Sequence, residues 1–105
     1  MALDITVTHE ADKCIVCVNG EVDVSNAAEL RSALEAALTG GTSKITADFS
    51  DVSYIDSTGI GVLVGIAHRA QEIQVVFVVA HPQKNVARVF DLLGVTEDLN
   101  VREND

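Results

Sequence analysis

YIDSTGIG, residues 54–61, places an acid, two hydroxyls and two glycines directly before the apolar run VLVGIA. Polar and flexible side chains are unusual at the start of a hydrophobic segment, so their purpose needs an explanation. Four explanations are open for the hydroxyls of Ser57 and Thr58: a helix cap, a catalytic turn, a phosphate-binding loop, or a hydroxyl that is itself modified. The rest of the sequence helps to choose among them.

The composition indicates one globular domain spanning residues 1–105, since 48% of the residues are hydrophobic. The net charge of −9 and the seven scattered basic residues argue against nucleic-acid binding. An acidic surface suits solubility and a basic protein partner. The first residues lack the order of a signal peptide, and the uncharged run GIGVLVGIA is about half as long as a membrane helix. We expect a cytoplasmic protein that binds neither nucleic acid nor membrane.

Apolar patterning predicts five strands, at residues 3–9, 13–24, 44–49, 73–80 and 96–101. The first reads as an edge strand and the second as an inner strand covered on both faces, with a turn or bulge near Asn19 and Gly20. Helical spacing predicts helices within residues 25–41, 59–71 and 81–94. Strands that alternate with helices of this length predict an α/β fold: a mixed four- to five-stranded sheet with crossover helices.

The ends of the first and third helices carry specific signals. Ser25 or Asn26 can cap the first helix, and the pair Gly40-Gly41 ends it. Pro82 suits the first turn of the third helix, and Gly94 suits its end. The inward residues of this helix are expected to be the apolar ones at helical spacing, Val86, Val89, Phe90 and Leu93.

The sequence CIVC at residues 14–17 could indicate redox chemistry or a zinc site. On a strand, however, an offset of three places Cys14 and Cys17 on opposite faces and about 10 Å apart, too far for a disulfide. No helix begins here to lower a thiol pKa, and the three histidines show no ligand spacing. We interpret both cysteines as buried structural thiols and expect no metal.

Catalysis is the least favoured explanation of residues 54–61. An aspartic-protease motif would need Gly directly after one hydroxyl residue, whereas two follow Asp56, and a second acid of the pair is missing. GIGVLVG fits a loose dinucleotide-binding turn, but the acid expected about 20 residues later is absent from VAH at 79–81. A nucleophilic serine needs a base and an orienting acid, and nothing assigns a histidine to that role. We therefore expect no enzyme activity.

A helix cap at Ser57 explains part of the pattern, because its hydroxyl could accept from the free N–H groups of the first turn. It does not explain three glycines within the helix, each of which costs about 1 kcal/mol relative to alanine. Gly61 and Gly65 lie one turn apart on one face. Close packing on the sheet and close approach of a partner explain this pair equally well.

The segment ADFSDVSYIDSTGIGVLVG resembles the signature of STAS domains, specifically the bacterial anti-sigma factor antagonists. VNGEVDVSNAAELRSAL resembles the Gly-Glu-x-Asp segment that leads into the first helix of this family, and HPQKNVARVFDLLGV resembles its third helix. The resemblance runs from about residue 13 to about residue 101. It implies the STAS fold, with the helices packed mainly on one face of the sheet.

The resemblance also implies a phosphorylation switch. An unphosphorylated antagonist of this family binds an anti-sigma factor, usually a serine kinase of the histidine-kinase-like ATPase fold, and so frees a sigma factor. The kinase would phosphorylate Ser57, and a metal-dependent serine phosphatase would reverse the reaction. ATP and magnesium would belong to the kinase, so this chain needs no cofactor.

Partner-binding residues carry over from the family as the loop and the nearby acids: Glu21, Asp23, Asp56, Ser57, Thr58, Gly59 and Gly61. Ordinary turn chemistry is the other explanation of Glu21 and Asp56. The connection AHRAQEIQVV lacks the glycines common in the family, which predicts a short second helix or loop. Relatives often add a closing helix where this sequence ends, four residues after Val101. Whether a self-association surface is exposed is left open at this point, and we expect a monomer or weak homodimer. The alternative functions are a STAS scaffold or transporter-associated subunit and a small-ligand STAS sensor.

Overall fold

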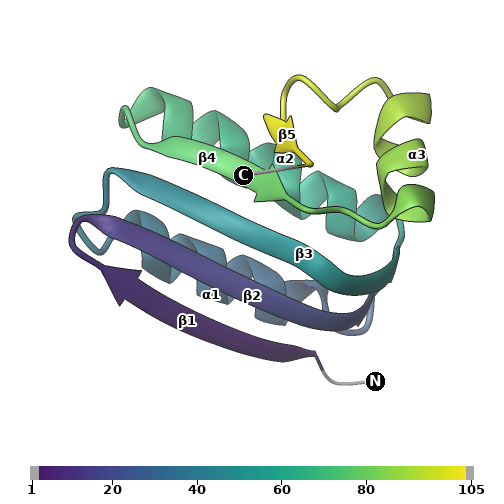
Figure 1. The fold of residues 1–105 in the computed structure, drawn as a ribbon, viewed down its shortest axis with the longest axis horizontal. Helices are drawn as coiled ribbons and strands as arrows, with labels where there is room; N and C mark the ends of the chain where they lie inside the picture. The colour runs from purple at the N-terminus through teal and green to yellow at the C-terminus, as the bar shows by residue number, and fades with distance from the viewer. Residues whose placement is uncertain (1–2, 104–105) are drawn as a thin grey trace.

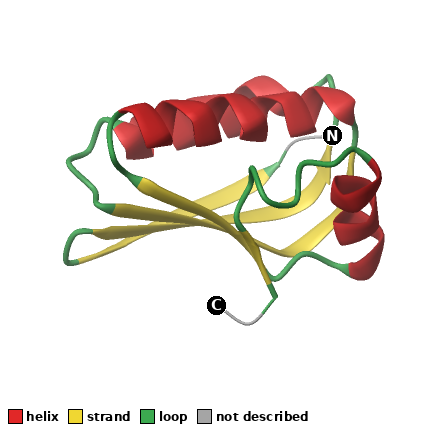
Figure 2. Ribbon diagram, turned by 90° about the horizontal axis from the view of Figure 1, so that it is seen from above, coloured by secondary structure: helices red, strands yellow, loops and turns green. Residues whose placement is uncertain are grey.

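A computed structural model describes residues 3–103 of the chain. One five-stranded sheet has the order β1-β2-β3-β4-β5, and α1 and α2 cover one of its faces (Figures 1 and 2). The elements are β1 (Asp4–Glu10), β2 (Lys13–Val22), α1 (Ala27–Leu38), β3 (Lys44–Ile55), α2 (Ser57–Glu72), β4 (Val76–Ala80), α3 (Lys84–Leu92) and β5 (Val101–Arg102). β1 is antiparallel to β2, and the other neighbours are parallel, which confirms the predicted mixed α/β sheet.

The core lies between the sheet and the helices that cross over it. Alternate residues of β2 point towards the helices, and Cys14, Val16 and Val18 are almost fully buried there. Leu30 and Leu34 of α1 and Leu63 of α2 are fully buried against them. Apolar side chains at strand and helix spacing therefore face one another, as parallel crossover units require. Among residues 3–103, no helix is long and apolar enough to cross a membrane.

β3 is twice as long as its expected range, and the difference positions the functional region. It pairs with β4 only from Lys44 to Asp48, and it continues beside β2 as far as Ile55. The sequence SDVSYI lies outside the expected strands and helices, but it is strand. It alternates irregularly, with Val52 and Ile55 buried, because the ladder with β2 contains register shifts near Asn19 and Gly20. The predicted bulge is thus confirmed.

α3 supports the part of β3 that β4 does not reach. Gln83 Nε2 donates to the carbonyl of Ser50 at 3.0 Å, and Asn85 Nδ2 donates to the carbonyl of Ser53 at 2.7 Å. These amides provide hydrogen bonds that a neighbouring strand would otherwise supply. The rings of Phe49 and Phe90 pack at a centroid distance of 6.5 Å below them.

Several expected details were wrong at the ends of elements. Pro82 lies before α3, which begins at Lys84, and Leu93 is 54% exposed because the helix has ended by then. The last strand is only Val101–Arg102, since the residues before it form turns. Gly94 has φ of +70°, a conformation in which glycine is favoured, so its predicted role as the helix stop is confirmed. The second connection is short, as expected, although α2 itself has 16 residues.

The two cysteines are free thiols on opposite faces of β2, but only one is buried. Cys14 lies in the core, where burial raises the pKa of its thiol. Cys17 is half-buried, on the face that α1 and α2 leave open, so the expectation that both faces of β2 are covered was wrong. Burial, with the nearby carboxylates of Asp48 and Asp51, raises the pKa of Cys17.

We predict that the two thiols react with a maleimide one after the other. Cys17 should be labelled first and slowly, because its raised pKa lowers the thiolate fraction, and Cys14 should follow only as the fold opens. Intact-mass measurement over time should show a singly labelled protein that accumulates, and Cys17→Ser should remove it. Simultaneous labelling of both thiols would contradict the burial of Cys14.

Candidate functional site

The carboxyl ends of β2 and β3 lie side by side and bring the predicted site residues together. Val22 pairs with Ile55 at the end of the parallel ladder, and Asp56 N–H donates to the carbonyl of Val22 at 3.1 Å. This bond extends the ladder by one step after the strands end. Asp23 and Asp56, which follow these strands, therefore occupy one edge of the sheet.

Asp56 is the single residue between β3 and α2, and its side chain caps the helix. It has extended backbone angles, and its Oδ1 accepts from Gly59 N–H at 3.0 Å. Its carbonyl accepts from Ile60 N–H at 3.0 Å. The expectation that Ser57 caps the helix was wrong, because Asp56 fills that role. Ser57 is instead the first residue of α2, and its side chain is exposed.

The loop from β2 to α1 is held by a buried amide. Asn26 is 1% exposed; its Oδ1 accepts from Asp23 N–H at 2.9 Å, and its Nδ2 donates to the Glu21 carbonyl at 2.8 Å. Asn26 occupies the predicted cap position of α1, but these two bonds point back into the loop. They fix the backbone on both sides of Val22, the residue that holds Asp56.

Asp23 is fixed in its charged form by the same loop. The Ser25 hydroxyl donates to Asp23 Oδ1 at 2.5 Å, and the Ser25 N–H donates to the same oxygen at 2.9 Å. Both hydrogen bonds hold the pKa of Asp23 below its usual value; the bond from the Ser25 hydroxyl has the larger effect and the bond from the Ser25 N–H the smaller. Asp23 is therefore an anion at neutral pH, close to the strand end that carries Asp56.

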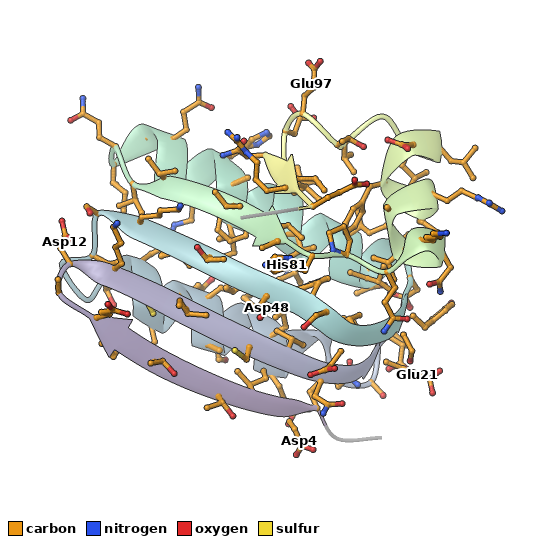
Figure 3. All side chains as sticks on the ribbon, viewed as in Figure 1. Asp4, Asp12, Glu21, Asp48, His81 and Glu97 are labelled. Carbon is orange, nitrogen blue, oxygen red and sulfur yellow. The ribbon has the colours of Figure 1, made fainter. Side chains whose placement is uncertain are left out.

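The other expected site residues lie at the surface around this edge. Thr58 and Gly61 are exposed on α2, and Glu21 is exposed at the end of β2, where it pairs across the sheet with Tyr54. Figure 3 shows Glu21 beside the carboxyl ends of β2 and β3. The site thus combines a neutral hydroxyl at Ser57 with three neighbouring acids, Glu21, Asp23 and Asp56.

Two exposed apolar side chains complete this surface, and the sequence reasoning missed both. Val24 is 75% exposed in the loop after β2, and Tyr54 is 48% exposed near the end of β3. Val24 ends a segment that was expected to be strand, and Tyr54 lies between an expected strand and an expected helix, so neither had a separate signal. Asn26 was considered only as a cap, although a buried amide beside a strand end also fits a loop tie.

The glycines of α2 have different surroundings. A Cβ atom at Gly59 would lie 2.6 Å from Val22 Cγ1 and 2.9 Å from Ile55 Cγ1, so the helix start packs directly on both strand ends. Gly61 and Gly65 are exposed, and a Cβ atom there would meet nothing within 4 Å. Close packing on the sheet, one of the two explanations for Gly61 and Gly65, was therefore wrong. It holds for Gly59 instead.

Comparison with known proteins agrees with this arrangement. The STAS domain family model matches residues 2–104. An anti-sigma-B factor antagonist of Staphylococcus epidermidis is 32% identical over 98 residues, covering 93% of this chain and 90% of that protein. One from Staphylococcus aureus (strain NCTC 8325 / PS 47) is 30% identical over 103 residues, covering 98% and 95%.

The fold has a close match among solved structures. The crystal structure of an anti-sigma factor antagonist from Mycobacterium paratuberculosis superimposes with a TM-score of 0.87 at 21% identity, over 95% of this chain and 85% of that one. The chain belongs to the STAS domain family. In residues 3–103, no group of three or more His, Cys, Asp or Glu side chains is arranged to hold a metal ion.

We predict opposite effects of alanine at two glycines of α2. Gly59→Ala should lower the free energy of unfolding by about 1–3 kcal/mol, because the new methyl group overlaps Val22 and Ile55. Gly61→Ala should raise it by about 1 kcal/mol, because alanine favours the helix and meets nothing. Urea denaturation measures both. Equal effects of the two substitutions would contradict the close contact of Gly59 with the strand ends.

Proposed function

We propose that this protein is an anti-sigma factor antagonist controlled by phosphorylation of Ser57. In its unphosphorylated form it binds an anti-sigma factor and so releases a sigma factor; phosphorylation ends the binding. Support comes from the curated relatives, which are named anti-sigma-B factor antagonists and align over nearly the whole chain. The observation that carries the proposal is the exposed Ser57 hydroxyl at the start of a helix held by two strand ends.

The start of α2 can accommodate a phosphoryl group on Ser57 while the helix stays folded. The cap leaves the N–H groups of Ser57 and Thr58 without an acceptor inside the helix, since Asp56 takes those of Gly59 and Ile60. These groups and the positive end of the helix dipole favour an anion. Asp23 and Asp56 oppose it by repulsion, which water and salt reduce at an exposed site. The fold should therefore tolerate the modification.

The interface with the partner offers no comparable groups to stabilise the added negative charge. The partner would contact a small neutral hydroxyl, and phosphorylation replaces it by a group with about −1.5 to −2 charges. Burying that charge against a surface shaped for a hydroxyl is costly. The exposed side chains of Val24 and Tyr54 supply apolar area on the same edge. We infer that this edge, with Glu21, Asp23 and Thr58, forms the contact.

The exposed glycines are consistent with the same contact. Ser57, Gly61 and Gly65 follow one another at spacings of four and so lie along one face of α2. Each glycine lowers helix stability by about 1 kcal/mol, yet neither is needed for packing within the chain. The second of the two open explanations, close approach of a partner backbone, would explain why a glycine stands at position 61.

The partner proposed here is a serine kinase of the histidine-kinase-like ATPase fold, with a metal-dependent serine phosphatase as the opposing enzyme. ATP and magnesium would be bound by the kinase, and this chain would act by binding rather than by catalysis. The reactions would take place in the cytoplasm. The protein would act as a monomer or weak homodimer.

We predict that Ser57→Ala binds the kinase-type anti-sigma factor with nearly unchanged affinity and that Ser57→Asp binds at least tenfold more weakly. Alanine keeps the surface small and neutral, whereas aspartate adds a charge that the interface must desolvate. Calorimetric titration against each anti-sigma factor of the source organism measures this. Incubation with ATP and magnesium should add one phosphoryl mass to the natural protein and none to Ser57→Ala.

Ser32→Asp is the matched control. It adds the same charge at an exposed position of α1 and should leave the affinity unchanged, because Ser32 is not among the residues proposed for the contact. If Ser57→Asp bound as tightly as Ser57→Ala, the proposed switch would be wrong. Equal losses in Ser57→Asp and Ser32→Asp would mean that net charge, not the site, controls binding.

A further inference from the structure

A second concave surface lies at the other end of α2. A cavity of about 500 Å³ opens between the last turns of this helix, the outer edge of β4 and the loop that precedes β5. Ala67, His68 and Gln71 line it from the helix, and Glu97 and Asp98 line it from the loop. Its volume is within the range of pockets that bind ligands. None of its residues belongs to the site around Ser57.

The floor of the cavity is an uncovered strand edge. β5 pairs with Val79 and Ala80, so within residues 3–103 no strand lies beside the first residues of β4 on that side (Figure 1). The N–H groups of Val79 and His81 point outward to β5, bonding the carbonyls of Leu99 and Arg102. Because alternate residues of a strand point the same way, the N–H of Phe77 also points outward, into the cavity.

An open edge of this kind is a template for another strand. Asn100 Nδ2 approaches the carbonyl of Phe77 at 3.4 Å, a long bond that an incoming N–H could replace. Peptides that add to a sheet edge gain affinity from main-chain bonds and specificity from side-chain pockets. The outward N–H of Phe77 offers a main-chain bond, and the cavity offers a side-chain pocket.

The walls of the cavity fit a long cationic side chain. Ala67, Val75 and the half-exposed Val76 provide apolar surface near the strand. Glu97 and Asp98 provide negative charge at the rim, and Figure 3 shows Glu97 projecting from the loop beyond β4. Lysine and arginine have an apolar stem and a charged head, so they match an apolar wall that ends in a negatively charged rim. The net charge of −9 favours the same sign of ligand.

We propose that this cavity binds an extended segment of a partner polypeptide that adds to the edge of β4 and inserts an arginine or lysine towards Glu97 and Asp98. It is separate from the Ser57 surface, because the 14 residue steps from Ser57 to Gln71 along α2 span about 21 Å. The protein could therefore hold a second partner while the first surface is occupied or phosphorylated. This inference does not depend on the proposed function.

The test uses the whole chain, isotope-labelled, and the acetylated and amidated peptide Thr-Val-Arg-Val-Thr in an NMR titration. We expect amide shifts at Val76, Phe77 and Asn100, and little change at Ser57. The same peptide with Glu in place of Arg should bind at least about fivefold more weakly, as should one with a methylated nitrogen at each Val. Glu97→Gln combined with Asp98→Asn should weaken the Arg peptide about fivefold.

Glu29→Gln, which removes an exposed acid from α1, is the control and should leave the affinity unchanged. Several results would overturn the proposal. These are no shifts at the β4 edge, equal binding of the Arg and Glu peptides, or an unchanged affinity in the double variant. Acetylarginine methylamide binding as tightly as the peptide would instead indicate a small cationic ligand. Shifts at the same amides on concentrating the protein alone would indicate a second copy of the chain.

Discussion

The structure of the functional edge depends on Asp56. Its N–H donates to the carbonyl of Val22 at the end of β2, and Asp56 directly follows β3. Its carboxylate and carbonyl accept hydrogen bonds from the first turn of α2. Asp56 therefore joins three elements. Val22 of β2 and Ile55 of β3 also lie against Gly59 of α2. Because the N-cap side chain and the strand ladder share this residue, the position and exposure of Ser57 follow from backbone bonds rather than from the serine itself.

Under the proposed function, this arrangement separates the demands of folding from those of regulation. The core beneath the site is apolar and close-packed, and the loop before α1 is tied by the buried Asn26. The exposed groups above it, Ser57 and Thr58, take no part in the cap or the core. A charge can therefore be added at Ser57 at little cost to the fold, while a partner that covers this edge must respond to it. Such a site can act as a switch without a conformational change.

Much of the fold could be predicted from the sequence, because its signals are local. Apolar periodicity located β1 to β4 and the helices α1, α2 and α3, whereas the last strand was expected at residues 96–101 and is only Val101–Arg102. Gly94 marked a helix end by a conformation that few other residues adopt. Errors arose where a neighbour in space decides the outcome. SDVSYI became strand because β2 pairs with it and because the side-chain amides of Gln83 and Asn85, at the start of α3, donate to its carbonyls. Cys17 stayed half-buried because, in the described part of the chain, α1 and α2 cover the other face of the sheet.

The site was predictable as a set of residues but not as a geometry. The motif identified Asp56, Ser57 and Thr58, and the parallel pairing of β2 and β3 brought Glu21 and Asp23 to them. Whether Asp56 or Ser57 caps the helix could not be decided from sequence, because both residue types are good caps and the exact end of β3 was unknown. The roles of Gly59 and Gly61 likewise depend on which face of α2 meets the strand ends.

In the proposed switch, phosphorylation of Ser57 changes the surface and leaves the fold intact. The most direct measurement is to compare the amide spectrum and the melting temperature of the natural chain before and after stoichiometric phosphorylation at Ser57. Shift changes confined to about residues 55–62 and the adjoining loop at Asp23, with a stability change within about 1 kcal/mol, are the predicted result. Widespread shift changes across α1 and α3 would show a conformational switch and would contradict the account.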